Sequence, residues 1–173
     1  GGEPLISPKF DRFLAEVMQL GLEDVSLTTN GQFLNDKLSV IESSGIKRIN
    51  VSLDSLTPVR FRQIARGGDL SKVLSGIDSA LQAGIKIKIN MVPMFSKNDS
   101  EIVPMLKYCL ERKIELRYIE LMRMGHLANG NSFSRDFVSM ALILDRIGEI
   151  YEFHRIDAPH DSTAQVFSVG ENR

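Results

Sequence analysis

Cysteine is almost absent from this chain: Cys109 is the single one among 173 residues. One thiol excludes an intrachain disulfide framework and favours a reducing compartment, so we expect a cytoplasmic protein. Neither sign of charge is in excess, because 21 Lys and Arg oppose 22 Asp and Glu for a formal net charge of −1. Without a basic footprint, nucleic acid is not an expected partner.

Long hydrophobic runs are absent as well. No apolar stretch approaches the roughly 20 residues that a membrane-spanning helix needs, and no signal peptide is visible, so no membrane association is expected. The chain does not begin with Met, and we therefore expect its natural N-terminus to have been processed or cut away. Its length suffices for one domain with a sizeable core.

What the sequence does contain is a regular alternation of strand-like and helix-like segments. Alternating apolar and polar residues predict strands at residues 24–30, 48–54, 86–94 and 115–122. Apolar residues at helical spacing predict six helices. The first runs from Ser7-Pro8 to Gly21, the second ends at Gly45, the third begins at Thr57-Pro58 and the fourth runs from Asp69 to Gly84. The last two lie over 98–112 and over roughly 136–149. Residues 126–133 read as a loop, and the tail after 149 as irregular with a possible strand at 165–169.

Four strand–helix units at this spacing predict right-handed βαβ connections and a parallel sheet with helices outside. A complete eight-stranded barrel needs about 250 residues, so the predicted fold is of the α/β class, a partial TIM-type β/α barrel. We expect a single domain over residues 1–173, with a core at 1–125 and a loop, a helix and the start of a C-terminal region at 126–173.

Each predicted strand has one apolar and one polar side. The polar positions of the first three strands are Ser26, Thr28, Asn30, Asn50, Ser52, Asp54, Lys86, Lys88 and Asn90. They cluster towards the carboxyl ends, the edge at which α/β sheets bind ligands. We therefore expect the polar side to line a wide, wet or ligand-filled cavity. The alternative is that it faces solvent in an open two-layer sandwich.

The chemistry of these residues leaves several roles open. Lys88 is a candidate Schiff-base nucleophile or a phosphate contact. Thr28 and Ser52 can exchange hydrogen bonds with a ligand. Asp54 is expected to cap the turn that follows its strand rather than to act in catalysis.

No metal site is predicted. His126, His154 and His160 lack metal-ligand spacing and are expected on the surface or in loops. Cys109 lies near the apolar stripe of a helix and is expected to be packed rather than reactive.

The chain begins with Gly1-Gly2-Glu3-Pro4. Two adjacent glycines allow a backbone to approach a ligand closely, and a carboxylate and a direction-fixing proline follow. Taken alone, the pair of glycines is more typical of a cloning remnant or a loose terminus than of a ligand site.

Together with GGEP, the motifs LTTNG, RINVSLDSL, KIN and RYIELMRMG follow in order. With them the chain resembles the radical S-adenosylmethionine (SAM) superfamily, and within it the GTP 3′,8-cyclases of molybdenum-cofactor biosynthesis, the molybdopterin biosynthesis protein A family. The resemblance extends from Gly1 to about Gly125. It implies a partial six-stranded barrel, SAM, 4Fe-4S clusters and GTP as substrate, which such lyases convert to (8S)-3′,8-cyclo-7,8-dihydroguanosine 5′-triphosphate on the way to cyclic pyranopterin monophosphate.

The resemblance also implies roles for five residues. Gly2, Ser52 and Met122 would bind SAM, and Thr28 and Lys88 would bind GTP. Lys88 would give a point charge to the triphosphate.

Two departures from the family pattern limit this reading. The cluster-binding cysteines, a C-x-x-x-C-x-x-C set and a C-terminal set, are absent from the chain, which is therefore expected to be an inactive fragment when isolated. Arg123 follows Met122 where the cyclases usually have proline. A radical SAM paralogue with another substrate, a Schiff-base lyase using Lys88 and a non-catalytic nucleotide-binding barrel remain alternatives, and a homodimer of the parent enzyme is left open.

Overall fold

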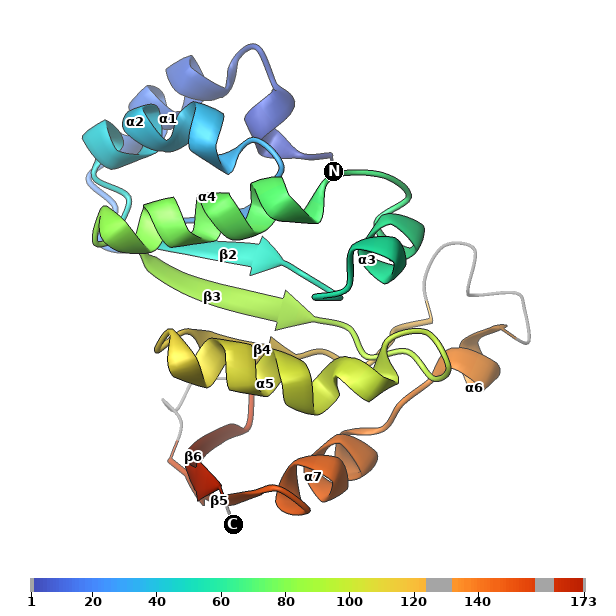
Figure 1. Ribbon diagram of the computed structural model, residues 1–173. Coiled ribbons are helices and arrows are strands. Elements are labelled where there is room, and N and C mark those ends of the chain that lie inside the picture. The colour runs from blue at the N-terminus through green and yellow to red at the C-terminus, as the bar shows by residue number, and fades with distance from the viewer. Residues whose placement is uncertain (1, 124–131, 158–163, 173) are drawn as a thin grey trace.

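A four-stranded parallel sheet forms the centre of the molecule (Figure 1). The computed structural model describes residues 2–123, 132–157 and 164–172. The strands follow one another in the order β1 (Ser26–Thr29), β2 (Arg48–Ser52), β3 (Lys86–Met91) and β4 (Glu115–Tyr118). Each strand is joined to the next through helices, which confirms the predicted βαβ arrangement.

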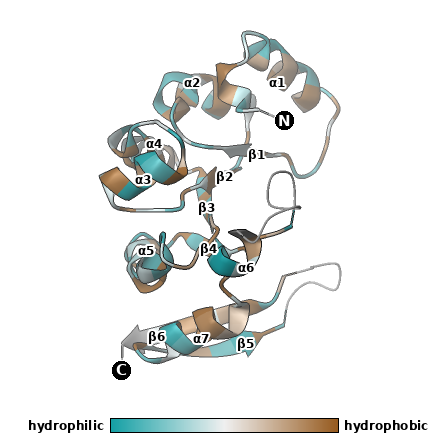
Figure 2. Cartoon of the chain, turned by 90° about the vertical axis from the view of Figure 1, so that its right-hand side faces the viewer, coloured by the Kyte–Doolittle hydropathy of each residue, from teal (hydrophilic) through white to brown (hydrophobic). Residues whose placement is uncertain are grey.

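The helices lie on one side of this sheet. They are α1 (Phe10–Met18), α2 (Leu34–Ser44), α4 (Leu70–Gln82) and α5 (Ile102–Glu111), while α3 (Pro58–Ile64) lies at the end to which β2 and β3 point. The view in Figure 2 shows α4 and α5 together on one side of the strands. The strand residues that face the helices, Leu27, Ile49, Val51, Ile87, Ile89 and Met91, are buried.

The polar side of the sheet is an open face rather than an enclosed cavity. In the described residues Ser26, Thr28 and Ser52 are exposed, and Asn50 and Lys88 are half-buried. The four described strands, with helices on one side, do not close on themselves, so the described residues do not by themselves enclose the expected cavity. The architecture is that of a partial β/α barrel.

Two predicted helix boundaries are confirmed, and one predicted helix start is displaced by two residues. Gly45 ends α2 in the left-handed conformation with φ of 88°, and Asp69 caps α4 by accepting the Ser71 N–H. Ser7 Oγ accepts the Lys9 N–H at 3.3 Å, as expected of a cap, but Pro8 and Lys9 form a turn and α1 itself begins at Phe10. A 3₁₀ turn, η1 (Pro4–Ile6), precedes Ser7. The helix predicted over 98–112 begins as a 3₁₀ turn, η2 (Asp99–Glu101), before α5.

The C-terminal part is more ordered than predicted. The helix expected over roughly 136–149 is α7 (Met140–Gly148). A short helix that was not expected, α6 (Ser132–Asp136), precedes it and begins within the expected loop. The tail expected to be irregular contains β5 (Tyr151–Ile156). It pairs antiparallel with β6 (Val166–Asn172), which confirms the possible strand predicted at 165–169. Residues 126–131 of the expected loop, and the expected division at 125/126, lie outside the described residues.

A second hydrophobic cluster holds α7 and this hairpin to α5. Its buried members are Ile102, Leu106, Val138, Ile143, Ile147 and Tyr151.

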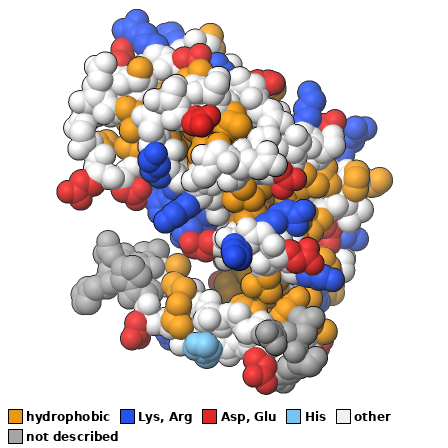
Figure 3. Space-filling view, turned by 60° about the vertical axis from the view of Figure 1, so that its left-hand side comes forward, with side chains coloured by type: hydrophobic (Ala, Val, Ile, Leu, Met, Phe, Trp, Pro, Cys, Tyr) orange, Lys and Arg blue, Asp and Glu red, His pale blue; other side chains and the backbone are white. Residues whose placement is uncertain are grey.

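Among the described residues no helix is both long and apolar enough to cross a membrane. On the face shown in Figure 3, acidic and basic side chains are interspersed.

Gly76 on α4 gives a direct test of how closely the helices pack. A Cβ at this position would lie 2.9 Å from the Leu34 Cβ of α2. We expect Gly76→Ala to lower the free energy of unfolding by about 1–2 kcal/mol, because overpacking outweighs the gain in helix propensity. Gly148→Ala on α7 is the control, since its Cβ would meet Phe153 at an ordinary 3.5 Å. Urea denaturation that shows Gly76→Ala to be as stable as Gly148→Ala would contradict this packing.

Candidate functional site

The carboxylate of Glu3 ties the N-terminal segment to the carboxyl end of β1. Its Oε1 accepts hydrogen bonds from Thr29 Oγ1 at 2.6 Å and the Leu5 N–H at 3.1 Å, and its Oε2 accepts the Asn30 N–H at 2.7 Å. The motif is therefore an integral part of the fold rather than a loose end. It holds Gly2 at the edge where ligands bind in α/β sheets, and a Cβ at Gly2 would meet nothing within 4 Å.

The two residues predicted to bind GTP lie on the open face of the sheet. Thr28 is beside Asn50 in the register, and Asn50 is beside Lys88. Asn50 Nδ2 donates to Thr28 Oγ1 at 3.3 Å. Lys88 Nζ forms an ion pair with Glu115 Oε1 at 2.6 Å, and the Lys88 side chain is only 12% exposed. A hydroxyl and an ammonium group thus face the same way from β1 and β3.

The residues predicted to bind SAM lie nearer the carboxyl edge. Ser52 ends β2 with its side chain exposed, and its register neighbour is Asn90. The Oδ1 atom of Asn90 is buried without a hydrogen-bond partner among the described residues. Met122 lies four residues beyond the end of β4 and is 56% exposed.

A pocket of about 340 Å³ opens beside Ser52. It is lined by the segments after β1 and β2, by α3 and by the turn after α3: Asn30, Gln32, Ser52, Asp54, Phe61, Ile64, Ala65, Arg66, Gly67 and Gly68. Gln32 holds that turn through two hydrogen bonds with the backbone of Asp69, of 3.1 Å and 2.8 Å. Gly68 packs on Gln32 with φ of 90°, so the turn requires glycine there. We did not predict this wall, although the Gly67-Gly68 pair marks a turn in the sequence.

Asp54 does not cap the turn that follows it, contrary to our expectation. Its Oδ1 accepts the Val92 N–H at 2.8 Å, so the side chain joins the end of β2 to the end of β3. Burial raises the pKa of this carboxyl, and the hydrogen bond from Val92 lowers it by a smaller amount. Asp54 is therefore a cross-strand link at the pocket.

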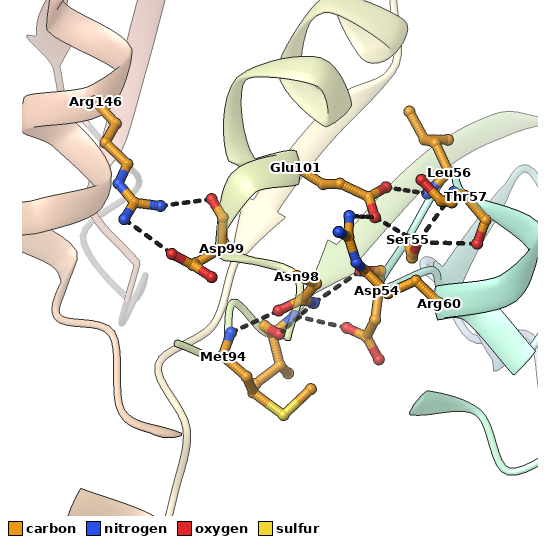
Figure 4. Close-up of polar contacts among 11 residues, drawn as sticks. Asp54, Ser55, Leu56, Thr57, Arg60, Met94, Asn98, Asp99, Glu101 and Arg146 are labelled. Carbon is orange, nitrogen blue, oxygen red and sulfur yellow. Dashed lines mark hydrogen bonds and ion pairs between the residues drawn. The ribbon is translucent and has the colours of Figure 1, made fainter. Parts of the chain in front are cut away.

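Glu101 is the centre of a polar network that sequence reasoning missed (Figure 4). Its carboxylate accepts hydrogen bonds from Ser55 Oγ at 2.6 Å and from the Leu56 N–H, and it pairs with Arg60 Nη1. Burial raises the pKa of Glu101, but these contacts from Ser55, Arg60 and Leu56 together outweigh it and hold the pKa below its usual value. The partners lie 41 to 46 residues away in the sequence, so no local pattern could reveal them.

The lowered pKa of Glu101 predicts a pH-dependent contribution to stability. Glu101 stabilises the fold above its unfolded-state pKa of 4.5 and loses this contribution as the pH falls through its lower folded-state value. We expect Glu101→Gln to cost about 2 kcal/mol at neutral pH, the scale of hydrogen bonds to a charged group. The difference from the wild type should shrink below pH 4.5 in urea denaturation.

The control for this prediction is Glu111→Gln, because Glu111 lies on α5 with a side chain 56% exposed. It should show no such pH-dependent difference. A Glu101→Gln deficit that stays constant across this pH range would show that the charge of Glu101 does not stabilise the fold.

Comparison with known proteins decides the family. The sequence profile of the Radical SAM superfamily matches residues 1–109. The chain belongs to the radical SAM superfamily. This assignment agrees with the partial β/α barrel and with the position of the Glu3 segment at its carboxyl edge.

The radical SAM chain is similar to several proteins named GTP 3′,8-cyclase. It is 36% identical to that of Sulfurovum sp. (strain NBC37-1) over 99% of this chain and 52% of the relative. It is 41% identical to that of Hydrogenovibrio crunogenus over 85% of this chain and 44% of the relative. The chain thus spans about half the length of these relatives.

A solved structure shows the same fold. It is the crystal structure of SuiB of Streptococcus suis bound to S-adenosylmethionine. The match covers 86% of this chain and 34% of the SuiB chain, with a TM-score of 0.63 and 18% sequence identity. The likeness extends the fold assignment beyond residue 109.

The residues of this radical SAM chain fit SAM. Asn90 Oδ1 is a buried acceptor that lacks a donor, which costs free energy unless a ligand supplies one. It lies beside the exposed hydroxyl of Ser52, and the pocket at Ser52 mixes polar groups with the apolar side chains of Phe61 and Ile64. This is the lining expected for a ligand with both polar and apolar parts.

The residues of this chain do not fit an iron–sulfur cluster. Cys109 is 1% exposed in the core, and burial raises its pKa to about 12. Thiolates are the usual cluster ligands. Within the described residues no group of three His, Cys, Asp or Glu side chains could hold a metal ion, and His154 lies exposed on β5. His126 and His160 lie outside the described residues.

Proposed function

We propose that the protein to which this chain belongs is a radical SAM GTP 3′,8-cyclase, a lyase of molybdenum-cofactor biosynthesis that acts in the cytoplasm. The product would be (8S)-3′,8-cyclo-7,8-dihydroguanosine 5′-triphosphate. The observation that carries the proposal is the similarity to GTP 3′,8-cyclases over 99% and 85% of this chain. It is supported by the shared open face of Thr28, Ser52 and Lys88.

In this proposal Gly2, Ser52 and Met122 bind SAM. SAM and a 4Fe-4S cluster would supply the radical chemistry when bound, and the described residues of this chain provide no ligand set for the cluster. Glu3 acts on Gly2 by fixing its segment to Thr29 and Asn30. The Ser52 hydroxyl donates or accepts at the pocket.

Thr28 and Lys88 bind GTP in the same proposal. The Lys88 ammonium provides a compact positive charge for a phosphate group. Its partner Glu115 is a carboxylate with a side chain 62% exposed, so an incoming phosphate competes with Glu115 for Lys88. Thr28, already bonded to Asn50, retains its hydroxyl hydrogen for a ligand acceptor.

The test uses the intact enzyme, purified anaerobically and reconstituted with iron and sulfide. With SAM, GTP and a strong reductant, we expect GTP-dependent release of 5′-deoxyadenosine and a cyclised nucleoside triphosphate, both detected by mass spectrometry. Failure to consume GTP under conditions that cleave SAM would overturn the cyclase proposal.

A second candidate is a radical SAM enzyme with a different substrate. The observation that favours it is Arg123, which stands where proline is usual in the cyclases and stacks on Phe133 of α6 with 4.9 Å between guanidinium carbon and ring centroid. Such an enzyme would form 5′-deoxyadenosine without consuming GTP. The Lys88–Glu115 ion pair weighs against a Schiff-base lyase, since Lys88 Nζ is held 2.6 Å from Glu115 Oε1 and would have to leave that contact to attack a carbonyl.

A further inference from the structure

Two buried polar side chains of the turn between β3 and α5 point towards the segment that follows β2, residues 54–60. Asn98 is 0% and Glu101 5% exposed. Neither belongs to the residues proposed to touch SAM or GTP. Because buried polar and charged groups are costly unless they are fully bonded, their partners show what this turn holds.

Asn98 locks the ends of two strands together. Its Nδ2 donates to the carbonyl oxygens of Asp54 at 2.7 Å and Val92 at 3.1 Å, and its Oδ1 accepts the Met94 N–H at 2.6 Å. Asp54 in turn accepts the Val92 N–H. The backbone just beyond β2 is thereby fixed to the backbone just beyond β3.

Glu101 holds the next part of the same segment. As Figure 4 shows, its carboxylate faces Ser55, Leu56 and Arg60, which supply a hydroxyl, a backbone N–H and a guanidinium group. Ser55 Oγ also accepts the Thr57 N–H at 3.0 Å, which extends the network to the residue before α3. One carboxylate therefore fixes both the β2–α3 connection and the first turns of α3.

This segment lies between two walls of the pocket. Ser52 and Asp54 precede it, and Phe61 and Ile64 on α3 follow it; all four line the pocket. A buried ion pair adds little net stability compared with apolar packing of the same volume, but it fixes the relative position of its partners through directed bonds. The network thus sets the geometry of the pocket wall from outside the pocket.

We propose that Glu101 is a positioning residue for the SAM site, acting through Ser55, Leu56 and Arg60 on the position of Ser52 and of α3. The inference rests on the proposed function, because it takes the pocket at Ser52 to be part of the SAM site. The GTP contacts Thr28 and Lys88 lie on β1 and β3 and have no part in this network.

The test compares Glu101→Gln with the wild type in the intact, reconstituted enzyme, at a temperature where circular dichroism shows both to be folded. The amide of glutamine turns a donor towards a site that already holds three donors. We expect the Kd and KM for SAM to rise by about tenfold or more, since small misplacements in a site cost up to about 100-fold. The KM for GTP should change by less than about twofold, whereas general structural damage would raise both constants.

Asp99→Asn is the matched control. Asp99 lies in the same turn, but its carboxylate pairs with Arg146 Nη2 of α7 at 2.9 Å, away from the β2–α3 connection. It should lower the melting temperature and leave the KM for SAM unchanged. If Glu101→Gln fails to fold, Arg60→Met is the second variant. It removes the guanidinium donor to Glu101 at a side chain that is 34% exposed, and it should raise the KM for SAM several-fold.

The outcomes separate the two proposals. A wild type that binds SAM, with a folded Glu101→Gln or Arg60→Met variant that binds it equally well, overturns the positioning role alone. Equal rises in the KM for SAM and for GTP also overturn it. A wild-type enzyme that does not bind SAM overturns the proposed function, and this inference with it.

Discussion

Replacing Lys88 with methionine should lower kcat/KM for GTP by about 100-fold or more in the intact enzyme. The Lys88 ammonium is a positive charge that the open face offers to a phosphate, and loss of one such contact in a site costs about 100- to 1000-fold. Methionine keeps a similar length and apolar stem, so a side chain that is 12% exposed remains filled. Steady-state kinetics with GTP at saturating SAM measure the effect.

Glu115→Gln separates a substrate role of Lys88 from a structural one. If Lys88 only stabilises the fold through Glu115, both variants should lower activity. If Lys88 binds phosphate, Glu115→Gln removes a competing carboxylate, and the KM for GTP should fall a few-fold. Lys86→Met, two residues earlier on the same side of β3 and exposed, should change neither constant. Loss of activity with Lys86→Met equal to that with Lys88→Met would contradict the assignment.

Replacing Glu3 with alanine should lower SAM turnover by about 100-fold, because the segment that carries Gly2 would lose its attachment to β1. The variant removes the carboxylate that accepts three hydrogen bonds, one each from Thr29 Oγ1, the Leu5 N–H and the Asn30 N–H. The fold should survive, since the buried core of the sheet does not include Glu3. The measurement is 5′-deoxyadenosine formation, with SAM affinity measured by equilibrium dialysis.

Thr29 supplies the matched pair for this prediction. Thr29→Ser keeps the hydroxyl that donates to Glu3 and accepts the Gly31 N–H at 3.0 Å, and it should retain most of the SAM affinity. Thr29→Val has the same shape without the hydroxyl and should reproduce part of the Glu3→Ala loss. SAM affinity unchanged by both Glu3→Ala and Thr29→Val would show that Gly2 does not depend on this anchor.

The sequence predicts the parallel sheet well because its signals are local. Gly45 and Asp69 act within one helix turn of where they stand, and the alternation of Ile49 and Val51 with polar neighbours reports which side of a strand is buried. The start of α1 is predicted to within two residues for the same reason. Ser7 Oγ accepts the Lys9 N–H as a local cap does, and one turn follows before the helix begins at Phe10.

The sequence predicts a possible strand at 165–169, where β6 lies, but β5 was missed although Tyr151 and Phe153 alternate with polar residues. Alternation over so few residues is a weak signal without a partner strand, and β6 follows ten residues later.

Within the site, the sequence predicts on which side of the sheet the side chains lie, but not the hydrogen bonds and ion pairs that hold them. Thr28, Ser52 and Lys88 were assigned to one side of the sheet from alternation alone, and the structure agrees. Glu101 could not be found in this way, since its partners lie in a different βα unit and its own neighbours read as an ordinary helix start. Asp54 was misjudged because a cross-strand bond to Val92 is decided by the register of β2 and β3.

Helix α5 belongs to two hydrophobic clusters at once. Met105 and Cys109 join the core of the parallel sheet, whereas Ile102 and Leu106 join α7 and Tyr151. The unit of α7 and the β5–β6 hairpin can therefore unfold locally while the sheet stays folded, which exposes the side of α5 that carries Ile102 and Leu106 to solvent. Amide protons of that unit should exchange with deuterium earlier than those of β2 and β3, so the slowest-exchanging residues should lie beneath the proposed site and the fastest at the hairpin.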